Sequence, residues 1–144
     1  MPIKQNILLT VDAVIFNEPD AYDRKVILVK RKNDPFKGLW ALPGGFVEDD
    51  EDLAVAAARE LEEETGVSID ETSLVQIGAF GAPGRDPRGR AVSVAFAGET
   101  TASQHNLVGA DDAEAADWFS VNELPKLAFD HADILRAALE KLKV

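Results

Sequence analysis

Residues 45–67 of this chain read GFVEDDEDLAVAAARELEEETGV. The acidic residues at 49–52 precede an apolar-periodic run, a place where a carboxylate caps a helix and complements its dipole. The apolar residues of one helix face recur every four positions, at Leu53, Ala57 and Leu61. Gly66 then supplies a C-terminal stop. Together these features predict a helix over residues 50–65 with one buried stripe.

Glutamates crowd the end of this predicted helix. Glu60, Glu63 and Glu64 are related by i,i+3 and i,i+4 spacing, so they converge on one face. Like charges at i,i+4 destabilise a helix by roughly 0.2–0.5 kcal/mol per pair. A divalent cation removes this repulsion, and oxygen ligands favour Mg²⁺ or Mn²⁺. Arg59 is placed to orient a carboxylate behind the metal ligands. The alternative interpretation is a solvated acidic helix face.

The rest of the chain alternates between strand and loop patterns. The predicted strands are residues 7–16, 25–31, 39–42, 74–80, 91–97 and 116–119. We predict a turn at 43–45 and a polar loop at 100–114, and an amphipathic helix at 130–142. With no internal repeat and no linker, a single mixed sheet with helices on its faces fits this order.

The composition is strongly acidic. A net charge of −11 disfavours nucleic acid as a partner, because phosphate binding depends on Lys and Arg. A small anionic substrate stays compatible, since metals and a local basic patch supply cations. The chain lacks cysteine, which excludes a disulfide framework. We find no signal peptide and no membrane-length apolar run, so we expect a cytoplasmic protein.

The spacing within residues 45–67 resembles the Nudix box, Gly-x5-Glu-x7-Arg-Glu-(aliphatic)-x-Glu-Glu-x-Gly-(aliphatic), and every defined position is matched. This resemblance implies an α/β/α sandwich with a central mixed sheet, as a single domain over residues 1–144. It also implies metal-dependent hydrolysis of the pyrophosphate of a nucleoside diphosphate linked to another group, X.

Site roles follow from the same resemblance. The implied metal-binding glutamates are Glu60, Glu63 and Glu64. A backbone carbonyl of Gly44 or Gly45 is a further candidate ligand, because a Gly-Gly pair lets the backbone approach a metal closely. Glu51 and Arg59 are expected to hold the geometry between loop and helix, by pairing with one another or with a ligand.

The general base is not specified by the box. In many Nudix enzymes a carboxylate on a later loop serves, shortly before a Trp-Phe strand, and here that region is 109–119. Asp112 and Glu114 are the candidates. For each, the alternative is a solvated acidic loop residue. Glu63 acting through a metal-bound water is the competing assignment.

Residues 80–90, FGAPGRDPRGR, hold three arginines in an otherwise acidic chain. Arginine suits bidentate phosphate recognition and stacking on a purine. The alternative is a rigid hairpin connection with solubilising arginines. Pro83 follows Val67 at the offset that marks Nudix ADP-ribose pyrophosphatases, and the wider context resembles bacterial members associated with NAD metabolism. The candidate substrate contacts are Arg31, Phe46, Pro83, Arg85, Asp86, Arg88 and Arg90.

The resulting hypothesis is hydrolysis of ADP-ribose to AMP and ribose 5-phosphate with Mg²⁺ or Mn²⁺. One alternative keeps the chemistry and changes X, giving a nucleoside-triphosphate or dinucleoside-polyphosphate hydrolase. Another is a non-catalytic ADP-ribose-sensing domain, which we disfavour because such regulators add a winged-helix segment and often carry a degraded box. The resemblance is also compatible with a homodimer that completes the adenosine pocket.

Overall fold

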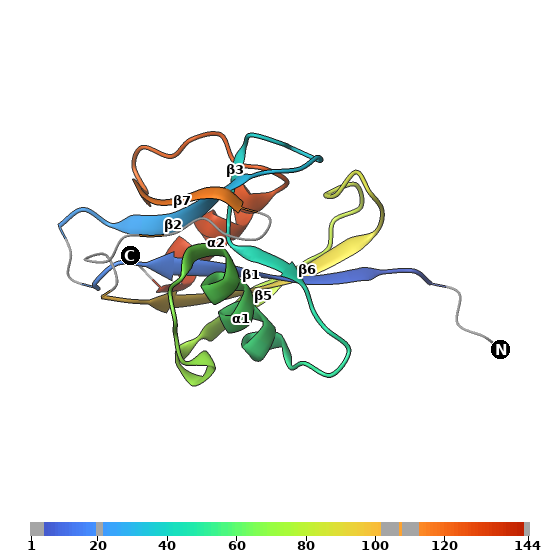
Figure 1. Cartoon of the computed structure of the whole chain (residues 1–144), viewed down its shortest axis with the longest axis horizontal. Coiled ribbons are helices and arrows are strands. Elements are labelled where there is room, and N and C mark those ends of the chain that lie inside the picture. The colour runs from blue at the N-terminus through green and yellow to red at the C-terminus, as the bar shows by residue number, and fades with distance from the viewer. Residues whose placement is uncertain (1–4, 20–21, 102–106, 108–112, 143–144) are drawn as a thin grey trace.

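The computed structural model describes residues 5–19, 22–101, 107 and 113–142 (Figure 1). The elements within these residues are β1 (Leu8–Phe16), β2 (Lys25–Arg31), β3 (Trp40–Ala41), β4 (Gly44–Phe46), α1 (Leu53–Thr65), the 3-10 helix η1 (Glu71–Ser73), β5 (Val75–Phe80), β6 (Ala91–Glu99), β7 (Ala113–Ser120) and α2 (His131–Leu142). None of these helices has the length and apolar character needed to cross a bilayer.

The strands form one seven-stranded mixed sheet. Its main path is β3-β2-β1-β6-β5, with β4 paired to β1 and β7 paired to β2. β1 and β6 run parallel from Leu8↔Ala91 to Phe16↔Glu99, while the other pairs are antiparallel. β1 therefore lies at the centre of the sheet, next to β4.

Alternation along β1 divides the core between the two faces of the sheet. Val14 and Phe16 belong to the cluster that contains the buried residues of α2. Val11 and Ala13 belong to the clusters that contain the buried residues of α1. The two helices consequently cover opposite faces, α1 in front of the sheet in Figure 1. The predicted α/β/α sandwich with a central mixed sheet is confirmed.

The box helix ends where predicted but starts later. Gly66 adopts φ 80° and donates its N–H to the Glu62 carbonyl, which closes α1. Asp52 caps the other end, with an extended backbone and a side chain that accepts from the Leu53 N–H. The predicted start at residue 50 is therefore wrong. The carboxylate of Glu51 turns instead toward the side chain of Arg59.

Two further boundaries differ from the prediction. Residues 43–45 do not form a turn alone, because β4 begins at Gly44 and pairs with β1 through Asp12↔Gly44. A side chain at Gly44 would collide with the Val11 carbonyl oxygen, so glycine permits this close pairing. β7 begins at Ala113, which places Glu114 on a strand rather than in the predicted loop. Pairing with β2 extends this strand beyond what its own sequence indicates.

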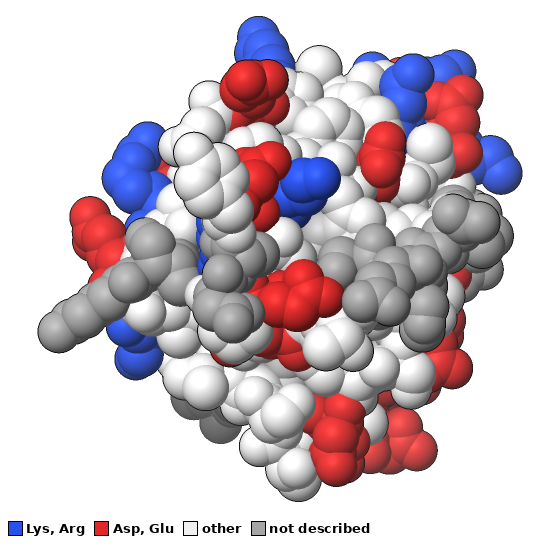
Figure 2. All heavy atoms as spheres, turned by 90° about the vertical axis from the view of Figure 1, so that its left-hand side faces the viewer, with Lys and Arg blue, Asp and Glu red and all other residues white. Residues whose placement is uncertain are grey.

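Charge on the surface is mixed. Figure 2 shows acidic and basic side chains interspersed over the described part of one end of the molecule, and the basic groups visible there are scattered. In contrast, most of the arginines that were predicted to be functional line a single cavity.

Candidate active site

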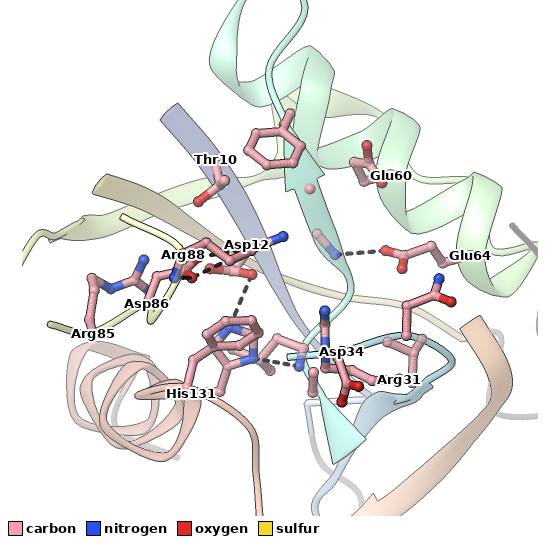
Figure 3. Close-up of a pocket in the computed structure, with 18 of the residues that line it drawn as sticks. Thr10, Asp12, Arg31, Asp34, Glu60, Glu64, Arg85, Asp86, Arg88 and His131 are labelled. Atoms are coloured by element: carbon pink, nitrogen blue, oxygen red, sulfur yellow. Dashed lines mark hydrogen bonds and ion pairs between the residues drawn. The ribbon is translucent and has the colours of Figure 1, made fainter. Parts of the chain in front are cut away.

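A cavity of about 410 Å³ opens where β1, β4, α1, the loop before β6 and the start of α2 meet (Figure 3). This volume lies within the range of pockets that bind small molecules. Its lining includes ten of the residues predicted from the sequence: Arg31, Gly44, Gly45, Phe46, Arg59, Glu60, Glu64, Arg85, Asp86 and Arg88. The cavity has one wall of carboxylates and one of arginines and aromatic rings.

The carboxylate wall comes from α1 facing β4. Glu64 is buried, and its Oε1 accepts the N–H of Gly44 at 2.8 Å. Glu60 approaches Gly45 so closely that a Cβ there would lie 2.7 Å from its Oε1. Glycine at this position therefore leaves the space that the Glu60 carboxylate uses. Both carboxylates face the cavity beside the β4 backbone (Figure 3).

Arg59 is the cation among the crowded glutamates. Its Nη1 lies 3.0 Å from Glu60 Oε1 and 3.1 Å from Glu63 Oε2. The same guanidinium donates to Glu51 and, through Nη2, to the Phe46 carbonyl at 3.1 Å. The ion pair with Arg59 holds the Glu63 side chain, which does not line the cavity. Arg59 thus offsets the repulsion between Glu60 and Glu63 within the chain itself.

The donor set on this wall suits a hard divalent cation. Within the described residues, no three acidic or histidine side chains converge to hold a metal by themselves. Glu60 and Glu64 nevertheless present two carboxylates beside the glycine backbone of β4. Mg²⁺ typically binds through one or two carboxylates and completes its shell with water and substrate phosphates. The residues present therefore fit Mg²⁺ or Mn²⁺.

The opposite wall stacks two arginines on one phenylalanine. The Arg31 guanidinium lies 4.9 Å from the Phe129 ring centroid, and its Nε donates to the Pro35 carbonyl at 2.7 Å. Arg88 lies 5.8 Å from the same ring and 5.7 Å from the ring of Phe46. These distances are those of cation–π contacts. Both cations are therefore held in place before any ligand arrives.

Two other predicted residues of this loop are engaged in ion pairs. Arg85 donates from Nη2 and Nε to the two oxygens of Asp130, at 2.7 and 3.0 Å, and its side chain is only 5% exposed. This pair ties the loop to the residue before α2. Asp86 is buried and binds Arg88, whose guanidinium holds the pKa of that carboxyl below its usual range. Arg88 still exposes 40% of its side chain.

Several predicted residues lie away from the cavity. Pro83 and Arg90 are exposed on the loop before β6 and do not line it. Glu114 points from β7 toward Lys30, with a 3.7 Å ion pair, and is also outside the lining. Asp112 falls outside the described residues. Of the two candidate bases, Glu114 is therefore described and is not brought to the carboxylate wall.

The lining also includes Asp12, Phe129 and His131, which were not among the predicted site residues. Phe129 adopts a positive φ of 52°, a strained conformation that is enriched at functional sites. Burial lowers the pKa of His131, so this imidazole is neutral. Asp12 carried a usable signal, because a charged residue inside an apolar strand needs a buried partner.

Comparison with known proteins shows the family. A NUDIX domain model matches residues 7–138. The chain is 47% identical over 114 residues to an ADP-ribose pyrophosphatase of Methanocaldococcus jannaschii, covering 79% of this chain and 65% of that protein. It is 39% identical over 141 residues to the ADPR responsive transcriptional repressor NtrR of Acinetobacter baylyi, covering 94% of this chain and 54% of that protein.

A solved structure gives the same relationship in three dimensions. The NUDIX domain of Shewanella oneidensis NrtR, complexed with ADP ribose, matches with a TM-score of 0.85 and 35% identity, over 96% of this chain and 90% of that one. The chain spans less than two thirds of the length of the two curated relatives. Because the family model covers most of the chain and the box is complete, this protein belongs to the NUDIX family.

Proposed function

We propose that this protein hydrolyses ADP-ribose to AMP and ribose 5-phosphate, with Mg²⁺ or Mn²⁺ as cofactor. The observation that carries the proposal is the two-walled cavity, in which Glu60 and Glu64 face Arg31 and Arg88 stacked on Phe129. A pyrophosphate flanked by two ribose groups, one bearing a purine, needs both a metal and fixed cations. The similarity to the archaeal ADP-ribose pyrophosphatase supports the same substrate.

The reaction is attack of a water oxygen on one phosphorus of the pyrophosphate. The bond from that phosphorus to the bridging oxygen breaks, the bridging oxygen stays on the other phosphate, and water loses a proton to a base. Glu60, Glu64 and the Gly44 backbone would hold the metal, which neutralises charge on the phosphates and lowers the pKa of water. Arg31 and Arg88 would orient the phosphates.

The remaining roles belong to the same proposal. Phe46 would stack on the adenine or a ribose, since it lies at the cavity mouth and is half exposed. Arg85 and Asp86 would hold the shape of the loop that delivers Arg88. Proton transfer stays assigned to Glu63, Asp112 or Glu114, and Pro83 and Arg90 stay predicted substrate contacts. A homodimer is the assembly we expect.

The test is release of AMP from ADP-ribose with Mg²⁺ or Mn²⁺. We compare the wild type with Glu60→Gln and Glu64→Gln, because glutamine keeps a carbonyl oxygen able to accept the Gly44 N–H while it removes the charge. Loss of metal binding costs several kcal/mol of barrier lowering. We therefore expect activity to fall by at least about 10²-fold in each variant. Glu62→Gln is the matched control, since Glu62 is exposed on the same helix and lies outside the cavity.

A substrate panel tests the identity of X. Faster turnover of 8-oxo-dGTP or of dinucleoside polyphosphates than of ADP-ribose would contradict the substrate assignment and leave the metal-dependent chemistry standing. Unchanged activity in both glutamate variants would contradict the site itself.

Sensing is the second candidate function. It is favoured by the similarity to an ADPR responsive repressor over 94% of this chain. A sensor predicts that ADP-ribose binds tightly with no release of AMP at any concentration of Mg²⁺ or Mn²⁺. Calorimetric binding and the AMP assay on the same sample separate the two functions.

A further inference from the structure

His131 connects α2 to the backbone that precedes β4. It is the first residue of α2, it is buried, and it lines the cavity from the opposite side to α1 (Figure 3). Its Nδ1 accepts the N–H of Leu42 at 3.0 Å, across 89 positions of sequence. The Nε2 atom lies 3.5 Å from Asp12 Oδ1. Because Nδ1 is the acceptor, the imidazole proton sits on Nε2 and faces Asp12.

Asp12 extends this connection across the sheet. Its Oδ2 accepts the hydroxyl of Ser93, a fully buried residue on β6. Its Oδ1 faces β4 as well as the histidine, since a Cβ built on Gly44 would lie 2.5 Å from it. Ser93, Asp12, His131 and Leu42 therefore form a chain of buried polar contacts that runs from β6 through β1 and α2 to the start of β4.

Three successive backbone groups before and at the start of β4 are pinned from three different elements. The Leu42 N–H donates to His131 of α2. The Pro43 carbonyl accepts the Ala13 N–H of β1 at 2.8 Å. The Gly44 N–H donates to Glu64 of α1 at 2.8 Å. Pro43 has no N–H to donate. The N–H of Leu42 is therefore the backbone donor that ties residues 42–44 to α2.

We propose that His131 is a positioning residue for the metal site. By fixing the Leu42 N–H, it sets the path of residues 42–44, and this path aligns the Gly44 backbone with Glu64 for a divalent cation. Partners that orient metal ligands typically contribute about 10–100-fold to metal affinity. The inference rests on the metal site of the proposed function, but not on the identity of the nucleotide.

Two substitutions at His131 separate positioning from packing. Asparagine places its amide oxygen close to the position of Nδ1, so His131→Asn keeps an acceptor for the Leu42 N–H. Glutamine places its amide close to the position of Nε2, so His131→Gln keeps the contact with Asp12 and loses that acceptor. Ile134→Val is the packing control, because it trims an apolar side chain of α2 that belongs to the same core cluster as Leu42 and offers no side-chain hydrogen bond.

The measurement is Mn²⁺ binding by electron paramagnetic resonance, without substrate and at a temperature where thermal melts show every variant folded. We expect affinity within about twofold of wild type for His131→Asn and Ile134→Val, and about tenfold weaker binding for His131→Gln. Equal weakening in both histidine variants, or full affinity in His131→Gln, overturns the inference.

A second variant covers the case in which His131→Gln does not fold. His131→Leu replaces the imidazole by an apolar side chain of similar size, so it too lacks an acceptor for the Leu42 N–H. At a temperature where this variant is folded, about tenfold weaker Mn²⁺ binding is expected, whereas full affinity overturns the inference. Failure of the proposed function is distinguishable, because a wild type that binds Mn²⁺ but releases no AMP from ADP-ribose contradicts ADP-ribose hydrolysis and leaves the metal site standing. A wild type that binds no Mn²⁺ overturns the positioning role as stated.

Discussion

Arg59 and Glu51 form a bidentate ion pair across the join between α1 and the loop before it. Nε of Arg59 lies 2.5 Å from Glu51 Oε2, and Nη2 lies 2.9 Å from Oε1. The Glu51 side chain is only 7% exposed. The guanidinium lowers the pKa of Glu51, and the carboxylate raises the pKa of Arg59. Both groups therefore stay charged, and the pair sets the angle at which the chain enters the helix that carries Glu60 and Glu64.

Neutralising Glu51 tests the strength of this pair. We expect Glu51→Gln to lower the free energy of unfolding by about 1.5–3 kcal/mol, the range for hydrogen bonds to charged groups. Denaturation in urea at neutral pH measures the change. Asp133→Asn is the matched control, because Asp133 pairs with Arg136 at 3.0 Å on the exposed surface. Such surface pairs contribute about 0–1 kcal/mol. Equal losses in the two variants would show that burial of the pair adds nothing.

The pH dependence of the same variant carries a definite sign. Glu51 has a lowered pKa in the folded protein, whereas glutamate in an unfolded chain titrates near about 4.3. The stabilisation that the ion pair contributes is therefore complete above the pKa of the unfolded chain. It is lost as the pH falls through the lower pKa of the folded protein. The stability difference between wild type and Glu51→Gln should shrink from about pH 5 to pH 3. A difference that stays constant over this interval would contradict the ion pair.

Buried His131 makes the free energy of unfolding depend on pH over a second, higher pH range. Desolvation lowers its pKa, so the folded protein keeps it neutral, while histidine in an unfolded chain titrates near about 6.5. Below that pH the unfolded chain binds more protons, and the protein loses stability as the pH falls from about 7 to 5. His131→Asn removes this term, so its unfolding free energy should depend less on pH over the same range. Parallel curves would contradict burial of a neutral imidazole.

Gly44 and Gly45 should respond differently to alanine. At Gly44 the new Cβ meets the Val11 carbonyl oxygen of the neighbouring strand, which cannot move independently, and a loss of about 1–3 kcal/mol in unfolding free energy is expected. At Gly45 it meets the flexible end of Glu60, at 2.7 Å from Oε1. Gly45→Ala should therefore fold with near-normal stability and bind Mn²⁺ about tenfold more weakly. Calorimetric melts and metal titrations compare the two, and the reverse ranking would contradict the packing described.

Arg31 should be sensitive even to lysine. Lysine keeps the charge but loses the planar stack on Phe129 and the bond from Nε to the Pro35 carbonyl. We expect Arg31→Lys to raise the KM for ADP-ribose about tenfold, equivalent to about 1.4 kcal/mol, with a smaller change in kcat. Arg136→Lys is the control, because Arg136 is exposed on α2 and lies outside the cavity lining, and Arg90→Lys tests the predicted contact on the loop before β6. If Arg90→Lys raises KM as much as Arg31→Lys, the loop residue, rather than the stacked pair, contacts the substrate.

Local patterns predicted much of this molecule. The burial of Ala57 and Leu61 in α1, its stop at Gly66 and the pairing of Glu51 with Arg59 all follow from spacing over a few turns, whereas Leu53 of the predicted stripe is only partly buried. These features were predictable because the interacting residues are near neighbours in sequence. The start of α1 was not predictable, because several consecutive acidic residues could have capped the helix. Only Asp52 adopts the capping conformation.

Local sequence patterns could not predict contacts between segments that are distant in the sequence. The ion pair of Arg85 with Asp130 joins residues 45 positions apart, and only the fold places α2 beside that loop. The substrate contact of Arg85 stays a prediction. The loop assignment of Glu114 failed for the same reason, because β2 supplies the strand that pairs with it.

Residue spacing along one segment was enough to predict the family, the helix with its glutamates and the ion pair that anchors that helix. The tertiary structure selected which charges face the cavity and which are neutralised within the chain. Asp130 neutralises Arg85, and Asp12 and His131 pin the backbone beside Gly44. These outcomes depend on distances between segments that only the packed sheet and its two helices bring together.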